Sequence, residues 1–375
     1  MTMTYTHASP EHGAPERADD VDDVARILQP DGTRVSDPAL DRWISDLPPH
    51  ELRALHRDMV LTRRLDTEGV ALQRQGQLAL WAPCRGQEAV QVATAHALAA
   101  GDLVFPSYRE HGVLLARGAR PADFVLAWRG EEHSAYDHAA LGVAPVQIII
   151  GAQALHATGW AMGAQRDRST DVAVAYFGDG ATSQGDVNEA MVFASSFRAP
   201  VVFVCSNNQW AISEPVTVQA RHPIAGRAPG FGIPSMRVDG NDALACLAAM
   251  RWALDHARRG EGPAFIEAVT YRLGPHTTSD DPTRYRDADE VERWSRRDPL
   301  ARLEAYLRDA GVLDDSGLAE VARAADAFAA EVRAACIGAV TRDPASVFDH
   351  VYAEPHAPLE RQRAEYVDYL DGFSR

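Results

Sequence analysis

The stretch that decides the fold reads VAVAYFGDGATSQGDVNEAMVFASSFRAPVVFVCSNN and covers residues 172–208. It predicts an apolar strand over 172–177, a helix over about 186–197 and a second apolar strand over 201–205. The first strand runs into Asp179 between two glycines, and the second ends at a pair of asparagines, the latter of which is Asn208. In a parallel sheet both points fall at the carboxyl ends of strands, where such folds bind ligands.

The side chains at these two strand ends suit a hard cation beside a phosphate group. One carboxylate and one amide oxygen are ligands that Mg²⁺ accepts, and they leave room for a diphosphate. The glycines flanking Asp179 let backbone N–H groups approach phosphate oxygens closely. Asp between glycines is also a common turn sequence, so the pairing with Asn208 at the next strand end carries this interpretation.

The flanking sequence predicts an α/β fold, with a mainly parallel sheet flanked by helices and further helices appended at the C-terminus. The other predicted elements are helices over 47–74, 86–100, 148–164 and 241–258 (with Asn241 as its cap), and strands over 101–108, 236–238 and 264–271. Residues 276–286 are predicted to be a loop, followed by two helices near 287–310 and 315–340. Residues 347–352 fit either a short strand or a docking segment.

The composition excludes several classes of function. Asp and Glu number 53 against 37 for Lys and Arg, which gives a formal charge of −16 and argues against nonspecific nucleic-acid binding. No apolar run approaches the ~18 residues that span a membrane. The chain contains no lysine, a bias that we attribute to a GC-rich bacterial genome. Schiff-base chemistry and a P-loop are therefore excluded.

Three regions are expected along the chain. Residues 1–35 are predicted to be a disordered acidic tail, which lacks both the apolar segment of a secretory signal and the composition of a mitochondrial presequence. Residues 36–345 are predicted to form one domain, and residues 346–375 a C-terminal docking segment. The four cysteines are widely spaced, which indicates reduced, mostly buried thiols in a cytoplasmic protein.

Two further motifs flank the central stretch: YREHG at 108–112 and TYRLGPHTTSDD at 270–281. Together with the GDG and NN of that stretch, they resemble the alpha subunit of the thiamine diphosphate-dependent 2-oxo acid dehydrogenases, the branched-chain 2-oxo acid and pyruvate dehydrogenase family. The resemblance covers roughly residues 45–345, with the motifs in the family's order. It implies the thiamine diphosphate-binding fold, with this chain supplying the diphosphate half of a site between subunits.

The resemblance also implies a set of site residues. Mg²⁺ is expected to bind Asp179, Asn208 and the backbone carbonyl of Trp210, with diphosphate oxygens and a water as further ligands. His276 is the expected catalytic residue, although outside this family it would fit a solvated loop histidine equally well. The implied cofactor-binding residues are Tyr108, Arg109, Ile150, Gly178, Asp179, Gly180, Ala181, Asn208, Arg272 and His276.

The activity implied by the resemblance is the oxidative decarboxylation of a small 2-oxo acid. Thiamine diphosphate accepts electrons as carbon dioxide leaves, and the acyl group passes to a lipoyl group of a partner acyltransferase. No glutamate of this chain is assignable to the cofactor's pyrimidine. That residue is expected on a separate beta subunit, so an α2β2 heterotetramer is implied.

The sequence leaves the substrate open. Segments 237–242 and 272–286 look closer to branched-chain than to pyruvate relatives, which favours 3-methyl-2-oxobutanoate dehydrogenase of branched-chain amino acid catabolism over pyruvate dehydrogenase. Acetoin dehydrogenase, which shares GDG and NN, is another alternative. A non-catalytic scaffold subunit is a third, because acidic residues over 131–137 replace a basic, glycine-rich stretch of the relatives.

Overall fold

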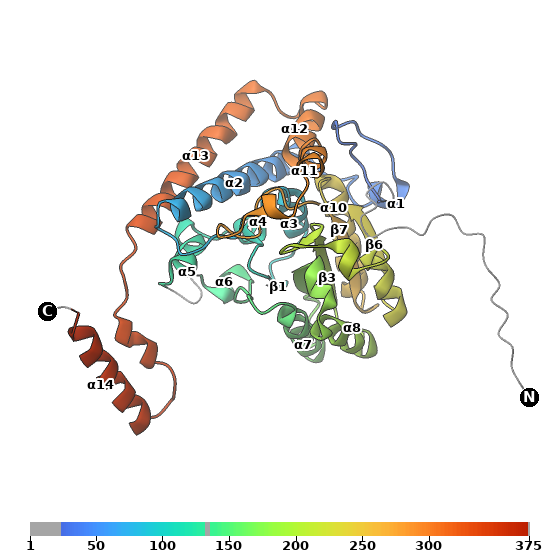
Figure 1. Ribbon diagram of the computed structural model, residues 1–375. Coiled ribbons are helices and arrows are strands. Elements are labelled where there is room, and N and C mark those ends of the chain that lie inside the picture. Colours follow the sequence, from blue (N-terminus) through green and yellow to red (C-terminus); the bar gives the residue numbers. More distant parts are fainter. Residues whose placement is uncertain (1–23, 132–135, 374–375) are drawn as a thin grey trace, which may run out of the picture.

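The computed structural model describes residues 24–131 and 136–373 (Figure 1). A five-stranded sheet has the order β1-β2-β3-β7-β6, and all of its strand pairs are parallel. Its strands are β1 (Leu103–Phe105), β2 (Ala173–Gly178), β3 (Val201–Asn207), β6 (Ser235–Asp239) and β7 (Ala264–Val269). The predicted α/β class with a mainly parallel sheet is thus confirmed.

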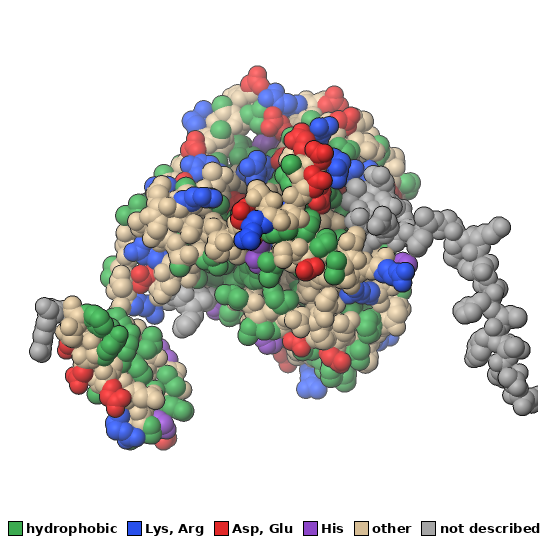
Figure 2. Space-filling model, in the orientation of Figure 1, with side chains coloured by type: hydrophobic (Ala, Val, Ile, Leu, Met, Phe, Trp, Pro, Cys, Tyr) green, Lys and Arg blue, Asp and Glu red, His purple; other side chains and the backbone are tan. Residues whose placement is uncertain are grey.

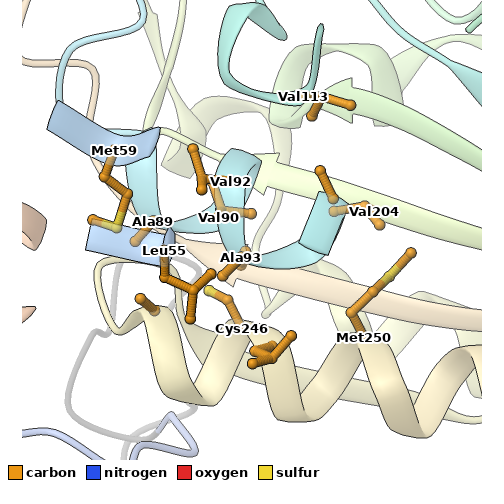
Figure 3. Close-up of a cluster of buried hydrophobic side chains, with 14 of the residues drawn as sticks. Leu55, Met59, Ala89, Val90, Val92, Ala93, Val113, Val204, Cys246 and Met250 are labelled. Atoms are coloured by element: carbon orange, nitrogen blue, oxygen red, sulfur yellow. The ribbon is translucent and has the colours of Figure 1, made fainter. Parts of the chain in front are cut away.

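One face of the sheet is covered by α3 (Glu88–His96) and α10 (Ala243–Arg258), and α2 (Pro49–Arg74) packs on α3. Val204 of β3 and Met250 of α10 both belong to the buried cluster on this side (Figure 3). Eight of the nine residues of α3 are buried, because α2, α4 (His111–Ala116) and α10 also pack against it.

The opposite face is covered by α7 (Ala152–Arg166), α8 (Gly185–Phe197) and the 3₁₀ segment η3 (Ile224–Phe231). Phe177 of β2 and Phe203 of β3 are fully buried there, with ring centroids 6.4 Å apart. Successive strand residues point to opposite faces, and both faces are covered, so β2 and residues 201–205 of β3 are almost entirely apolar.

The register of the strands brings the sequence motifs together. Gly178 of β2 pairs with Ser206 of β3, and Asn207 of β3 pairs with Val269 of β7. Because all of these strands run in the same direction, the loops that follow β1, β2, β3 and β7 leave the sheet at one edge. The motifs lie in these four loops.

The structure corrects the predicted cap of α10. Asp242, rather than Asn241, accepts hydrogen bonds from the backbone amides of Leu244 and Ala245 at 3.0 and 3.1 Å. The Asn241 side chain instead donates to the carbonyl of Arg297 at 2.8 Å. Adjacent Asn and Asp residues are both good caps, so the sequence pattern alone did not separate them.

The predicted boundary of the N-terminal tail, residue 35, is also wrong. Ile27 and Leu28 are fully buried, and both of their backbone amides donate to Asp242 Oδ2 at 2.6 Å. Ala25 forms a parallel bridge with Val238 at the edge of the sheet. Residues 24–35 therefore pack on the domain, and the rest of the predicted tail lies outside the described residues.

The C-terminal helices differ in number from the prediction. Three helices replace the expected two: α11 (Ala288–Ser295), α12 (Pro299–Asp309) and α13 (Asp315–Ile337), the last of which packs along α2 (Figure 1). Asp298 caps α12 and Pro299 begins it, which ends the preceding helix.

Beyond α13 the chain leaves the body of the molecule (Figure 1). The alternative of a short strand over 347–352 is wrong, because Pro344–Phe348 forms the 3₁₀ segment η5. Helix α14 (Ala357–Asp371) packs on η5 and has no buried residue. Figure 2 shows hydrophobic side chains on the surface of this segment, and Val347, Tyr369 and Phe373 are all more than half exposed.

The remaining described elements are short. They are α1 (Pro38–Asp41), α4 (His111–Ala116), η1 (Pro121–Phe124), α5 (Leu126–Arg129), α6 (His138–Leu141), η2 (Asp179–Ser183), β4 (Trp210–Ala211), β5 (Glu214–Pro215), α9 (Val216–Gln219) and η4 (Pro282–Arg284). The four cysteines are free and buried, as predicted. Among the described residues, no helix has the length and apolar character needed to cross a membrane.

Candidate active site at the carboxyl edge of the sheet

A cavity of about 480 Å³ opens at the carboxyl edge of the sheet, within the usual size range of small-molecule sites. The structure brings nearly all of the predicted site residues to its wall. Those that line it are Tyr108, Arg109, Ile150, Gly178, Asp179, Gly180, Ala181, Asn208, Trp210 and His276. Of the predicted residues, only Arg272 is absent from this wall.

Asp179 begins the turn η2 directly after β2 and is almost fully buried. Burial raises the pKa of its carboxyl to about 6. Gln219 of α9 donates to Asp179 Oδ2 at 3.2 Å, which holds the carboxylate in one orientation. The next residue must be glycine, because a Cβ at Gly180 would lie 2.7 Å from the Cβ of Ala211.

Asn208 lies just beyond the end of β3 and is 7% exposed. Its Oδ1 accepts a hydrogen bond from the backbone amide of Trp210 at 3.3 Å, and its Nδ2 donates to Gln87 Oε1 at the same distance. Asn207 faces away from this pairing and donates to Glu267 Oε1 at 2.7 Å. Asn207 is therefore structural, and Asn208 is the asparagine that reaches the cavity.

Arg109 and His276 form a pair in the wall of the cavity. Arg109 Nη2 donates to the carbonyl of His276 at 2.8 Å and to its Nδ1 at 3.2 Å. Because Nδ1 accepts, the proton of the neutral ring is on Nε2. Burial, together with the charges of Arg109 and Arg272, lowers the pKa of His276 to about 4. His276 is therefore neutral at pH 7 and offers one N–H donor.

Arg272 lies behind this pair rather than in the cavity. It follows β7 and is fully buried, and burial lowers the pKa of its guanidinium to about 10. Its Nη1 donates to the carbonyl of Trp210 at 3.1 Å, and its Nη2 to the carbonyl of Ile212 at 2.7 Å. In this structure Arg272 thus fixes the hairpin after β3.

A buried carboxylate supports the loop that holds Arg109. Asp66 accepts hydrogen bonds from Trp81 Nε1 at 2.8 Å and from the backbone amides of Cys84 and Arg85 at 3.0 and 3.1 Å. Between these anchors, the carbonyl of Pro83 accepts from Arg109 Nη1. Asp66 was not singled out from the sequence, where it is one of several acidic residues on α2.

Three further polar side chains line the cavity and were also missed. Gln87, Gln153 and Ser206 are each at most 3% exposed. Gln87 Nε2, Gln153 Oε1 and Ser206 Oγ have no hydrogen-bond partner among the described residues. Buried polar atoms of this kind are usually satisfied, so this wall fits a polar ligand that supplies both donors and acceptors.

The mouth of the cavity has the opposite character. Ile148, Ile149, Ile150 and Ile212, which we call the apolar rim, are 69%, 71%, 39% and 57% exposed. Three of them also line the cavity. Exposed apolar groups that cluster beside a cavity are typical of a surface covered by a partner.

Of the acidic segment 131–137, residues 132–135 lie outside the described residues. Glu131 pairs with Arg129 at 3.3 Å, and its other carboxylate oxygen accepts from the backbone amide of Arg342 at 3.1 Å. Asp137 caps the short helix α6. The described ends of the segment therefore have structural contacts.

The described residues also hold no cluster of three or more His, Cys, Asp or Glu that would suit a metal ion.

The chain is similar to known proteins over most of its length. Residues 56–344 match the family model described as the dehydrogenase E1 component. A 3-methyl-2-oxobutanoate dehydrogenase subunit alpha of Mycobacterium tuberculosis is 50% identical, over 91% of this chain and 92% of that protein. A pyruvate dehydrogenase E1 component subunit alpha of Acholeplasma laidlawii is 38% identical, over 87% and 95%.

A 2-oxoisovalerate dehydrogenase subunit alpha of Pseudomonas aeruginosa is 36% identical, over 97% of this chain and 94% of that protein. The family match covers most of the domain, from α2 to the end of the C-terminal helices that pack on it. The chain belongs to the dehydrogenase E1 component family.

Proposed function

We propose that the chain is the alpha subunit of a bacterial, cytoplasmic 2-oxo acid dehydrogenase that acts on branched-chain 2-oxo acids. The observation that carries this proposal is the 50% identity, over nearly the full length of both chains, to a relative named for 3-methyl-2-oxobutanoate. The pyruvate dehydrogenase relative is less similar, at 38%. Pyruvate dehydrogenase is the second candidate.

The proposed cofactor is thiamine diphosphate with Mg²⁺. When bound, thiamine diphosphate stabilises the carbanion that forms as a 2-oxo acid loses carbon dioxide. The carboxylate of Asp179, the amide oxygen of Asn208 and the carbonyl of Trp210 would hold the metal ion. That carbonyl already accepts from Arg272, but a carbonyl has two lone pairs, so one remains for Mg²⁺.

The chain's other cavity residues have separate proposed tasks. Arg109 and Tyr108 would face the diphosphate, where the guanidinium charge favours an anion. The neutral His276 ring would donate its Nε2–H toward the reacting group or the incoming lipoyl arm. Ile150, at the apolar rim, would contact the apolar part of the cofactor. Arg272 would keep Trp210 in place from behind.

The apolar rim supports an incomplete site that a beta subunit completes in an α2β2 assembly. The isoleucines of the rim are exposed to solvent beside a polar cavity. A partner chain that covered this rim would exclude water from the reaction. The C-terminal segment, residues 346–375, is proposed to dock on a partner chain as well, because its exposed apolar side chains have little of this chain to contact. The acyl group would pass to a lipoyl acyltransferase.

The test is a reconstitution of the chain with a beta subunit from the same organism, assayed with thiamine diphosphate, Mg²⁺ and a panel of 2-oxo acids. We expect kcat/KM to be higher for 2-oxoisovalerate, 4-methyl-2-oxopentanoate and 3-methyl-2-oxopentanoate than for pyruvate. An apolar pocket gains roughly 0.8 kcal/mol per buried methylene, which allows about one to two orders of magnitude. A higher kcat/KM for pyruvate than for all three would replace this proposal with pyruvate dehydrogenase.

A further inference from the structure

Gln87 is a buried cavity residue that contacts Asn208 and keeps its amide nitrogen without a partner among the described residues. It lies immediately before α3, is 1% exposed and lines the cavity beside Asn208. Its Oε1 accepts from Asn208 Nδ2 at 3.3 Å, across a separation of 121 residues in the chain. Its own Nε2 is buried and has no hydrogen-bond acceptor among the described residues.

The backbone fixes which end of each amide faces the other. The amide of Trp210 can only donate, and it lies 3.3 Å from Asn208 Oδ1, so the atom at that position must be the oxygen. Nδ2 of Asn208 therefore faces Gln87, and Gln87 must present its oxygen to it. By elimination, the donor end of Gln87 is the end left without a partner.

This chain of contacts has two consequences for a metal ligand. Turning an asparagine amide by half a turn exchanges oxygen and nitrogen at almost no steric cost, and only the oxygen can bind a cation. The Trp210 amide makes the turned form of Asn208 unfavourable, and the hydrogen bond to Gln87 holds the Asn208 side chain in place beside it. Meanwhile the Nε2–H of Gln87 is a buried donor without a partner among the described residues, and an acceptor oxygen of a bound ligand would satisfy it.

We propose that Gln87 is a positioning residue for the Asn208 amide and, through Nε2, a hydrogen-bond donor to an oxygen of the bound diphosphate. This inference rests on the proposed function, since it assigns a role within the Mg²⁺–diphosphate site. Asp179 has an equivalent partner in Gln219, which donates to Oδ2. Each of the two proposed metal-binding side chains thus contacts a glutamine from another part of the chain, Gln87 before α3 and Gln219 at the end of α9.

Two substitutions separate the positioning role from the donor role. Gln87→Met keeps the length of the side chain but removes both the acceptor for Asn208 and the donor for the ligand. Gln87→Glu keeps an acceptor for Asn208 Nδ2 and replaces the donor with an oxygen that repels phosphate. Gln165→Met is the matched control, because Gln165 lies on the outer surface of α7, where its amide contacts the carbonyls of Phe197 and Arg198.

The experiment uses the reconstituted tetramer of each variant and calorimetric titration. Two quantities are measured: the Kd of thiamine diphosphate at saturating Mg²⁺, and the half-saturating Mg²⁺ concentration at saturating thiamine diphosphate. We expect Gln87→Met to raise both by at least about tenfold. Gln87→Glu should raise the Kd of the cofactor by a similar factor and leave the Mg²⁺ concentration within about threefold of the wild type. The control should match the wild type in both.

Wild-type values of both quantities in the Gln87→Met variant would overturn the inference while leaving the proposed function intact. Equal rises of both quantities in Gln87→Glu would overturn the separate donor role. A wild-type tetramer that does not bind thiamine diphosphate would instead overturn the proposed function, whatever the variants do. Thermal unfolding checks that each variant is folded, and if Gln87→Glu does not assemble, Gln87→Met alone decides the test.

Discussion

The inner wall of the cavity and its apolar rim are close in space and opposite in character. On the inner wall, Asp179, Asn208 and Arg109 are each at most 7% exposed and are held by hydrogen bonds from other elements. On the rim, Ile148 and Ile149 are about 70% exposed. The inner wall is already organised in the single chain, whereas the rim exposes clustered apolar side chains that folded proteins usually bury.

The difference shows where the chain is complete and where it is not. Fixed carboxylate, amide and guanidinium groups can bind a charged ligand without rearranging, which lowers the entropic cost of binding. The exposed isoleucines contribute favourable free energy only when another surface buries them away from water. We infer that this chain holds the diphosphate end of the cofactor by itself, while the rest of the site forms on assembly.

The largest expected effect on ligand binding comes from removing a proposed metal ligand from the inner wall. Asp179→Ala or Asn208→Ala should weaken binding of Mg²⁺–thiamine diphosphate by at least about tenfold, or about 1.4 kcal/mol, because a hard six-coordinate ion tolerates such losses poorly. Calorimetry on the tetramer measures this. Asp186→Asn, on an exposed turn of α8, is the control. Unchanged affinity in both alanine variants would show that the ligand assignment is wrong.

The largest expected effect on stability comes from Asp66, which supports the inner wall. Burial raises the pKa of Asp66 to about 6, above the ordinary value of 3.8. Between these two pH values the folded chain holds a proton that the unfolded chain has released, so the contribution of Asp66 to stability falls as pH rises. The shift from 3.8 to about 6 corresponds to about 3 kcal/mol.

Denaturant unfolding of the wild type and of Asp66→Asn at several pH values checks this prediction. The asparagine cannot titrate, so the difference in unfolding free energy between the two proteins isolates the carboxyl group. Relative to Asp66→Asn, the wild type should lose stability from about pH 4 to pH 6 and then change little. A difference that stays constant, or rises over that interval, would contradict the burial argument.

A charge on the apolar rim should impair assembly rather than folding. Ile149→Glu places a carboxylate on a side chain that is 71% exposed, so the isolated chain should keep its melting temperature. Association with the beta subunit should weaken by roughly tenfold or more, because a buried unpaired charge is costly. Analytical ultracentrifugation measures this association. Val340→Glu is the control, because Val340 is 85% exposed and lies outside the rim. Normal assembly of Ile149→Glu would place the interface elsewhere.

The smallest predicted effect separates two roles of His276. His276→Ala should impair reductive acylation of the lipoyl domain more than decarboxylation measured with an artificial electron acceptor. Because the neutral ring offers one N–H donor, the difference should be about threefold to tenfold, as for one hydrogen bond of about 1 kcal/mol. Equal losses in the two assays would point to cofactor binding instead.

The sequence predicts the sheet and the positions of Asp179 and Asn208 because both depend on local patterns, an apolar strand and the residue that follows it. It does not predict Gln87 or Asp66. Gln87 meets Asn208 across 121 residues, and Asp66 meets Trp81 from the buried side of α2, so each role depends on packing between elements. Arg272 shows the reverse case. Its motif is clear in the sequence, but its side chain donates to the carbonyls of Trp210 and Ile212 and does not line the cavity.

The central claim is that Asp179 and Asn208 hold a metal–diphosphate group at the carboxyl edge of the sheet. The most direct test is a crystal structure of the tetramer with thiamine diphosphate and Mn²⁺ in place of Mg²⁺, with the ion located by its anomalous scattering. The account predicts an anomalous peak about 2.1 Å from an oxygen of each side chain, with the diphosphate as a further ligand. An ion bound elsewhere, or a diphosphate bound without contact to either side chain, would contradict it.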